Sequence, residues 1–345
     1  MRKRESVIAV IAIIAVAAVA ALVAGVARGR SNGTVLSGAG STFVAPLVAQ
    51  WTPAIGKAYG YTVDYNPIGS GGGIQAISTR QVDFGASDAP LTKDQFAGCH
   101  GCIQIPWALS ATSVVYNLPG AKSLLHVNGV TLEGIFSGRI TRWDDPALRK
   151  LNPGVSLPST RITPVHRSDN SGTTYNFTDY LSSVSAAWKA KVGNGVAVSW
   201  PTGTSGRGSS GVAAQVSQTP GAIGYVDVAY ALASHLKYFA VQNRAGRFTT
   251  PGLRGILAAA TSDRKPASDD SLSIVNPPGR FASAYPISTF TYVIAPRSTS
   301  KAPALKRMIL WAVTKGQAFG PRLRFAPLPE SILAVDRRAV AKIHA

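Results

Sequence analysis

Three short loops combine small residues, hydroxyl side chains and a predicted helix start: 40–43 (GSTF), 69–73 (GSGGG) and 169–174 (DNSGTT). The first turn of a helix has free N–H groups and partial positive charge, which suit it to an anion. Glycine lets the backbone approach a ligand closely, and Ser or Thr adds a hydroxyl donor. One such loop is usually only a helix cap. Three in one chain predict a shared oxyanion site.

Two kinds of charged group near these loops indicate which anion would bind. Arg167 precedes the third loop, and its planar guanidinium can hold two oxygens of a tetrahedral oxyanion, with Asp169 orienting it. Asp88 lies in the loop FGASDAP, where a carboxylate would repel a fully ionised anion but accept a hydrogen bond from a protonated one. The pattern therefore favours protonated phosphate over sulfate.

The segments around the loops predict how they are positioned. Alternating stretches at 61–68 and 161–167 are typical of strands, and amphipathic stretches after the loops are typical of helices. This order of strand, glycine-rich loop and helix predicts an α/β protein with mainly parallel strand pairing. Further strands are predicted at 196–200 and 285–296, and further helices at 131–138, 304–315 and 331–343.

The length of 345 residues suits two domains. The two final helices need a partner surface, and the N-terminal region has few helices of its own. We therefore expect the chain to cross between domains near 109–113 and 285–290. Lobe I would comprise 31–110 and 287–345, and lobe II would comprise 111–286, joined by a two-segment hinge.

Residues 1–30 form a separate segment, in which three basic residues precede an apolar run from Val7 to Ala27. Such a start is typical of export, with Met1 in the cytoplasm. The run is longer than a usual cleavable signal of ~7–15 apolar residues and can span a hydrocarbon core of ~30 Å. Gly25-Val26-Ala27 also suits cleavage, so an uncleaved anchor and a removed signal both stay open. Either one places the rest of the chain outside the cytoplasm, membrane-tethered or secreted.

The two cysteines, Cys99 and Cys102, suit an oxidising compartment. A redox C-x-x-C pair normally follows a strand and opens a helix, whereas this pair precedes the strand-like IQIPW. Zinc needs about four ligands, and only His100 is close in sequence. The spacing favours a structural disulfide, with a redox pair and a metal site as weaker alternatives.

The formal charge of +19 and a pI of about 10.3 would attract anions and speed their capture at low salt. Lys and Arg are dispersed along the chain, without the basic stripe typical of nucleic-acid binding. We interpret the charge as an adaptation to an acidic or anionic cell surface, and we expect no nucleic-acid partner.

The same residues resemble the phosphate ABC-transporter substrate-binding protein family. Seven strings occur in the family's order and span nearly the whole chain after residue 30: GAGSTF…AP (38–46), GSGGG (69–73), VDFGASDAPL (82–91), LNPG (151–154), HRSDNSGTT (166–174), TPGAIGYV (219–226) and YPI (285–287). VDFGASDAPL is the most specific of them. The resemblance implies a type II periplasmic-binding-protein fold, in which two α/β lobes close over one dehydrated phosphate.

The resemblance also implies a role for individual residues of lobe I. Thr42 and Phe43 would donate backbone N–H groups, with help from the Thr42 hydroxyl. Ser70 would donate from its side chain and its backbone, and Asp88 would accept the phosphate proton. Val44 stands where the family usually has Pro.

In lobe II, the resemblance implies that Arg167 clamps phosphate oxygens while Asp169 supports it. Ser171, Gly172 and Thr173 would complete the cage. Asn170 stands where Gly is usual. Because Asn tolerates left-handed backbone geometry, we expect the loop to keep its shape.

Two other classes of function have weaker support. Ser171 with His166 could suggest a hydrolase, but no G-x-S-x-G elbow is present, and strand alternation turns His166 away from Arg167. Gly206-x-Gly-x-x-Gly211 matches a dinucleotide fingerprint, although Asp227 follows too closely, and we interpret the loop as a capped helix start. A cell-surface adhesin or polyanion-binding protein that reuses the fold would account for the charge.

We therefore expect a non-catalytic, extracytoplasmic protein that captures inorganic phosphate for an ABC-type importer. Its partners would be the permease and ATPase subunits of that importer, and the membrane through residues 7–27. We expect a monomer without a cofactor or metal.

Overall fold

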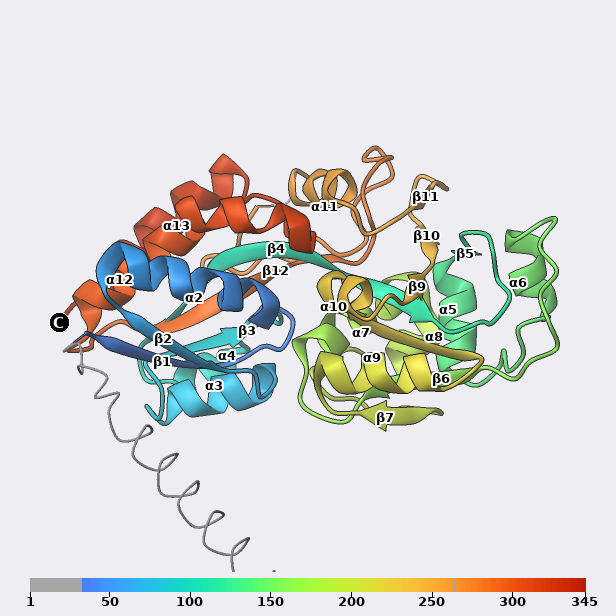
Figure 1. Ribbon diagram of the computed structural model, residues 1–345, viewed down its shortest axis with the longest axis horizontal. Coiled ribbons are helices and arrows are strands. Elements are labelled where there is room, and N and C mark those ends of the chain that lie inside the picture. Colours follow the sequence, from blue (N-terminus) through green and yellow to red (C-terminus); the bar gives the residue numbers. More distant parts are fainter. Residues whose placement is uncertain (1–32, 263–264) are drawn as a thin grey trace, which may run out of the picture. The chain divides into compact units, whose positions relative to one another are not determined.

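The computed structural model describes residues 33–262 and 265–345 (Figure 1). The chain divides into two units, residues 1–34 and Val35–Ala345, and every helix and strand below belongs to the second. The apolar run at 7–27 lies outside the described residues. Within the described ranges, no helix is long and apolar enough to cross a membrane.

The main sheet has nine strands within the described residues. Its first half contains β2 (Thr62–Asn66), β1 (Val35–Gly40), β3 (Phe84–Ser87) and β12 (Ser288–Pro296), in that order. The long strand β4 (Cys102–Tyr116) follows. The second half contains β8 (Ala222–Asp227), β6 (Thr163–Arg167) and β7 (Thr204–Gly206), while β9 (Lys237–Tyr238) pairs with β4.

Strand direction differs between the halves and the centre of the sheet. In the first half β1 is parallel to β2 and β3, and in the second half β6 is parallel to β7 and β8. β12 and β4 are antiparallel to their neighbours. The predicted parallel pairing therefore occurs within each half, around an antiparallel centre.

β4 runs continuously from one half to the other (Figure 1). Its residues Cys102 to Ala111 pair with β12, and Thr112 to Tyr116 pair with β8. All fifteen residues of the strand are buried, consistent with its near-continuous apolar sequence. The change of partner falls between Ala111 and Thr112.

Helices cover both faces of the first half. In Figure 1, α2 (Ala45–Tyr59), α12 (Ala302–Val313) and α13 (Glu330–Ala341) lie above the strands, and α3 (Ser70–Ser78) and α4 (Lys93–Gly98) lie below. Two 3₁₀ turns, η1 (Lys315–Phe319) and η2 (Pro321–Leu323), join α12 to α13. The indole of Trp51 on α2 donates to the Gly316 carbonyl at 2.8 Å. The C-terminal helices thus pack on the N-terminal part of the chain.

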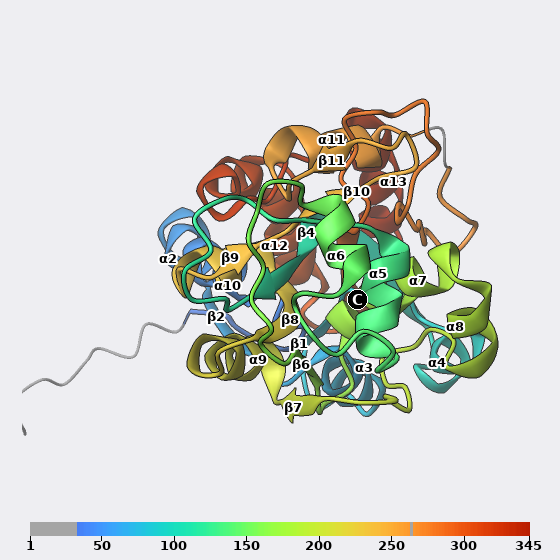
Figure 2. The same ribbon diagram turned by 90° about the vertical axis from the view of Figure 1, so that its right-hand side faces the viewer.

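Around the second half, the helices α5, α6, α7 and α8 lie on the face turned toward the viewer in Figure 2. The helices of this half are α5 (Gly129–Phe136), α6 (Pro146–Leu151), α7 (Gly172–Val184), α8 (Ala186–Lys191), α9 (Gly208–Gln218), α10 (Val228–Ala233) and α11 (Leu253–Ala260). A small sheet in the order β11 (Phe248–Thr249), β10 (Ala240–Gln242) and β5 (His126–Val127) completes it.

The strand predicted at 196–200 was wrong. This segment is irregular, and β7 at Thr204–Gly206 takes the edge position beside β6. The Val196 carbonyl accepts the N–H of Ser171, and the Trp200 ring stacks on His166. Through these contacts, residues 196–200 pack against the second half instead of adding a strand to its sheet.

Candidate functional site

The predicted site loops follow the carboxyl ends of the parallel strands in both halves. β1, β2, β6 and β7 lead into α2, α3, α7 and α9, and β3 leads into the loop that contains Asp88. Ligand sites of α/β sheets usually lie at such strand ends. The hydrogen bonds below bring the four helix N-termini together, so their partial positive charges face one region. We call this region the cage.

Asp88 forms the wall of the cage on the first half, and its side chain is almost completely buried. Three hydroxyl groups donate to its carboxylate. Ser41 and Thr291 donate to Oδ1, the latter at 3.2 Å, and Ser70 donates to Oδ2 at 3.5 Å. Ser41 precedes α2, Ser70 begins α3 and Thr291 lies on β12, so three separate elements converge on one carboxyl group.

Burial raises the pKa of Asp88 to about 6, although the hydroxyl groups of Ser41 and Thr291 and the charge of Arg167 act in the opposite direction. Burial disfavours the charged form of a carboxyl group because the interior solvates charge poorly. The group can therefore change its charge near neutral pH. It accepts hydrogen bonds when ionised and donates one when protonated.

Arg167 forms the facing wall, and its side chain is only 1% exposed. Its Nε donates to Asp169 Oδ1 at 2.7 Å, and its Nη2 donates to Asp169 Oδ2. Its Nη1 makes long contacts with the hydroxyls of Thr173, at 3.4 Å, and Ser209, at 3.5 Å. The carboxylate thus fixes one edge of the guanidinium, and Nη1 faces the cage.

Asp169 is held in its charged form. Burial acts to raise its pKa, but the hydrogen bonds and charge of Arg167 and the backbone N–H of Gly208 outweigh burial and lower the pKa below its ordinary value. The Gly208 N–H, at the start of α9, donates to Oδ1 at 3.0 Å. Asp169 therefore joins Arg167 to the first turn of α9.

The two halves of the sheet meet at the cage. The Ser70 hydroxyl accepts the backbone N–H of Gly172 at 3.1 Å, and the Thr42 hydroxyl lies 3.1 Å from that of Ser209. Gly172 must be glycine for this approach, because an added Cβ would lie 2.7 Å from the Asp88 backbone nitrogen and 2.6 Å from the Ser70 hydroxyl.

The sequence of the chain is similar to those of known proteins. Residues 25–315 match the family model described as PBP superfamily domain. The phosphate-binding protein PstS of Xylella fastidiosa (strain Temecula1 / ATCC 700964) is 41% identical over 303 residues, which cover 86% of this chain and 82% of the relative. The chain belongs to the PstS family. The PstS of Pasteurella multocida (strain Pm70) is 38% identical over 304 residues and covers 86% of this chain and 87% of the relative.

A solved structure supports the fold of this PstS-family chain. A high-affinity periplasmic phosphate-binding protein, crystallised with phosphate, matches with a TM-score of 0.72 and 22% sequence identity, over 88% of this chain and 93% of the other. The chain therefore has the α/β periplasmic-binding-protein fold, and the family resemblance seen in the sequence is confirmed.

The structure brings the predicted site residues of this PstS-family chain to the cage or its helix caps. Thr42, Ser70, Asp88, Arg167 and Gly172 take part in the contacts above. The Ser171 hydroxyl caps α7 by accepting the Thr174 N–H at 3.2 Å, and the Thr173 hydroxyl faces Arg167. The backbone N–H of Phe43, expected as a ligand donor, contacts the Ser41 hydroxyl at 3.0 Å.

Asn170 keeps the loop shape in a way that differs from the expectation. It does not adopt the left-handed conformation. Its carbonyl instead accepts the N–H of Gly71 at 3.0 Å, which ties the loop to the start of α3. The side chain fits because Gly71 has no Cβ, which would lie 2.4 Å from that of Asn170.

Sequence reasoning missed three hydroxyl residues of the cage. Ser41 lies inside the predicted loop at 40–43, next to Thr42, and its hydroxyl donates to Asp88. Thr291 was placed on a strand but was not assigned to the site. Ser209 lies within the dinucleotide-like fingerprint at Gly206 to Gly211. This segment begins α9 next to Thr42, and the N-cap residue of the helix makes no side-chain cap hydrogen bond.

The contacts of His166 and Asp227 do not support the enzymatic alternatives. The His166 ring stacks on Trp200 with 4.9 Å between centroids, and its Nδ1 contacts the Arg167 carbonyl rather than Ser171. Asp227 is fully buried and caps α10 by accepting the Ala229 N–H at 2.8 Å. No group of three or more metal-binding side chains occurs among residues 33–262 and 265–345.

Cys99 and Cys102 are joined by a disulfide at the start of β4. Arg80, just after α3, donates to the carbonyls of Ile77, at 2.7 Å, and Cys99, at 2.9 Å. The disulfide loop is therefore tied to the C-terminal end of the helix whose N-terminus carries Ser70.

Proposed function

We propose that this chain is an extracytoplasmic binding protein that captures inorganic phosphate and delivers it to an ABC-type importer. The observation that carries the proposal is the cage, in which a buried acceptor, Asp88, faces a buried cation, Arg167, among four helix N-termini. The curated relatives at 41% and 38% identity are named phosphate-binding protein PstS, and the solved structure with the same fold binds phosphate.

Arg167 supplies the positive charge for phosphate oxygens. Because Asp169 holds Nε and Nη2, the guanidinium is oriented before the ligand arrives, and Nη1 is directed at the oxyanion. The N–H groups at Thr42, Phe43 and Ser70, those of Gly172 and Thr173, and the Ser171 hydroxyl supply further donors from both halves. Preorganised donors of this kind bind an anion without the cost of ordering them at the time of binding.

Asp88 supplies selectivity. As a carboxylate it accepts a hydrogen bond from a protonated phosphate oxygen, whereas sulfate has no proton to offer and meets like charge in a buried site. A buried acceptor left without a donor costs about 1–3 kcal/mol, and more when charged. One residue thus separates two anions of the same shape.

The halves of the sheet act as lobes that close over the ligand. Residues 31–110 and 287–345 form lobe I and residues 111–286 form lobe II, with the connections near 109–113 and 285–290 as the hinge. The change of partner along β4 at Ala111 and Thr112 supports this division. The hydrogen bonds between the halves form on closure and exclude water.

The protein acts outside the cytoplasm, tethered through residues 7–27 or secreted after their removal. In its closed form it docks, as a monomer, on the permease of an importer driven by ATPase subunits. No residue carries out a chemical step, since transport requires only capture and release.

Calorimetric titration of protein stripped of phosphate tests the proposal. We expect tight one-to-one phosphate binding and no heat from sulfate at pH 7.5 and moderate salt. If the folded, ligand-free protein gave no heat with either ion, the phosphate assignment would fail. Salt-sensitive binding to an anionic polymer would then favour the cell-surface alternative.

A further inference from the structure

A cavity of about 260 Å³ lies against the outside of the cage. Its inner wall consists of cage residues, namely Thr42, Asp169 and Gly208. Its outer wall includes Arg207 and Ser210, both exposed to solvent. The cavity therefore extends from the cage contacts to the surface.

Both halves of the sheet contribute to this cavity. Thr42, Pro67 and Ile68 come from the first half, and the remaining lining residues come from the second. Because its walls belong to both halves, the cavity widens when they separate. A ligand that enters the cage from this side of the seam passes the cavity.

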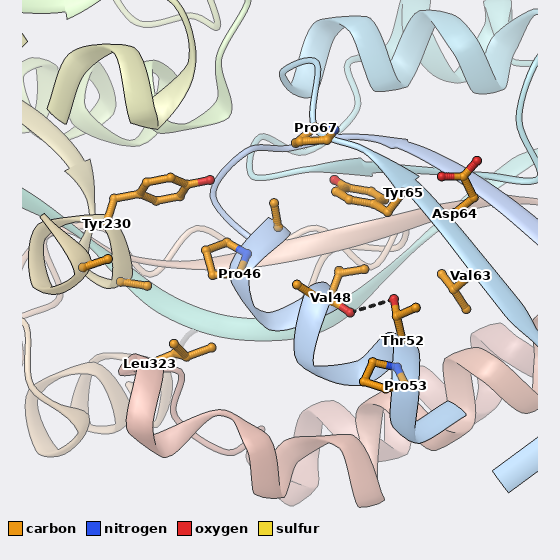
Figure 3. Close-up of a pocket in the computed structure, with 14 residues that line it drawn as sticks. Pro46, Val48, Thr52, Pro53, Val63, Asp64, Tyr65, Pro67, Tyr230 and Leu323 are labelled. Carbon is orange, nitrogen blue, oxygen red and sulfur yellow. Dashed lines mark hydrogen bonds between the residues drawn. The ribbon is translucent and has the colours of Figure 1, made fainter. Parts of the chain in front are cut away.

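A second cavity of about 620 Å³ continues along the same seam (Figure 3). It lies mainly between α2 and β2 of the first half and α10 of the second, and it shares Pro67 and Tyr230 with the smaller cavity. Figure 3 shows Tyr230 extending from α10 toward the first half, with its hydroxyl directed to the side where Pro67 and Tyr65 lie. The larger cavity is mostly apolar and has Asp64 at one end, so it offers an anion little attraction.

Charge distinguishes the smaller cavity. Of its described lining residues, Arg207 and Asp169 are charged, and Asp169 is already neutralised by Arg167. Arg207 forms no ion pair with any residue in the described part of the chain. Its side chain does not cap α9, so local structure does not require it. An exposed, unpaired cation thus stands beside the route to a buried anion site.

We propose that the smaller cavity is the access vestibule of the phosphate cage and that Arg207 is its capturing cation. This inference rests on the proposed function. Arg207 attracts the anion during encounter and releases it to Arg167 and the helix N-termini, so it raises the association rate rather than the stability of the closed complex. Steering by exposed charge acts mainly on association and weakens as salt screens it.

Rapid-mixing kinetics of the whole protein with inorganic phosphate test the role. In Arg207→Gln, we expect the association rate constant to fall about threefold or more at low ionic strength, and the difference to shrink at about 0.5 M salt. The dissociation rate should change less than about twofold, so the Kd rises mainly through the slower association. Arg207→Lys keeps the charge and should retain the wild-type rate.

Arg254→Gln is the matched control. It removes the same charge from an exposed position that lines a different cavity, of about 570 Å³, near β11 and α11. We expect its association rate to stay close to that of the wild type.

Two results would overturn the inference while leaving the proposed function intact. Equal rates for Arg207→Gln and Arg254→Gln would show that only net charge matters. Faster dissociation with unchanged association would make Arg207 a ligand of the bound ion. Wild-type protein that binds no phosphate would refute the proposed function itself, and the vestibule with it.

Discussion

Asp88 and Asp169 come from opposite halves of the sheet, and their surroundings shift their pKa values in opposite directions. Burial among hydroxyl groups raises the pKa of Asp88 to about 6. Asp169 is also partly buried, but the hydrogen bonds and charge of Arg167 lower its pKa. The two side chains are chemically identical, so the difference comes entirely from the groups around them.

Because of this difference, the two aspartates can have different roles in the cage. Asp169 stays charged, so it can hold a cation in place whether or not a ligand is bound. Asp88 forms no ion pair with any residue that the structure describes, so under the proposed function its carboxyl group can respond to the proton on a ligand. Under the proposed function, the wall with Arg167 would therefore supply positive charge, and the wall with Asp88 would distinguish protonated from unprotonated anions.

The largest effect should come from breaking the charged wall. Arg167→Ala removes the buried cation and leaves Asp169 unpaired beside the incoming anion, which should cost about 3–5 kcal/mol of phosphate binding free energy. Arg167→Lys keeps the charge but loses the fork that contacts both oxygens of Asp169, and should cost less. Calorimetry measures both variants, with thermal unfolding as a check on folding.

Arg139→Ala is the control for this variant. Arg139 pairs with Glu133, but its side chain is 60% exposed, so its removal should leave phosphate affinity unchanged. If phosphate affinity of Arg167→Ala stayed within twofold of wild type, another cation would have to serve the cage.

The next effect should come from pushing the two walls apart. In Gly172→Ala the new methyl group meets the Asp88 backbone and the Ser70 hydroxyl, so the halves cannot approach as closely. Overpacking of this kind typically costs about 1–3 kcal/mol, which should appear as roughly five- to 150-fold weaker phosphate binding. In Gly98→Ala the new methyl group meets no atom within 4 Å, and phosphate affinity should not change. Equal affinities in the two variants would mean that the ligand does not need the closed approach.

The pH dependence of sulfate affinity tests the role of Asp88. Below its pKa of about 6 the protonated carboxyl group donates a hydrogen bond, which sulfate can accept. Sulfate affinity should therefore rise about tenfold as the pH falls from 7.5 to 5. Asp88→Asn has a permanent donor and should bind sulfate at pH 7.5 without this pH dependence. Sulfate binding that is equally weak in wild type and variant at both pH values would contradict the assigned role.

The raised pKa of Asp88 predicts that the free energy of unfolding of the ligand-free protein depends on pH. The folded-state pKa of Asp88 lies above its ordinary value of 3.8, so the folded protein binds more protons than the unfolded chain between about pH 4 and pH 6. Its contribution to the free energy of unfolding is present below pH 4 and is lost as the pH rises through 6. Denaturant unfolding of wild type and Asp88→Asn across this range should show the difference.

Sequence reasoning succeeded where neighbours in the chain define the chemistry. Arg167 and Asp169 are two residues apart, and the glycine loops signal helix starts, so this ion pair and these helix N-termini could be predicted. The roles of these residues toward phosphate stay predictions. Asp88 was found through a distinctive string. The crossings near 109–113 and 285–290, inferred from the two final helices, stay a prediction.

Features that depend on strand register could not be predicted. Thr291 lies 203 residues from Asp88, and Ser209 lies 167 residues from Thr42. Only the alignment of β12 with β3, and the contact between the halves, brings these hydroxyls to the cage. The strand expected at 196–200 failed for a related reason, because apolar alternation does not distinguish an edge strand from a covering loop.

Ser209 gives the smallest expected effect and tests a residue that the sequence did not reveal. Its hydroxyl contacts Thr42 at 3.1 Å and Arg167 at 3.5 Å, so it links the charged wall to the first half without carrying charge. Ser209→Ala should weaken phosphate binding by about 0.5–1.5 kcal/mol, the net worth of one neutral hydrogen bond.

A double-mutant cycle with Thr42→Val separates this link from a simple loss of polarity. If the two hydroxyls act together, the double variant should cost less than the sum of the single variants. Ser217→Ala, exposed on the same helix, should have no effect on phosphate binding. Strict additivity would mean that Ser209 and Thr42 contribute independently, and that contact between the halves at this point does not stabilise the closed cage.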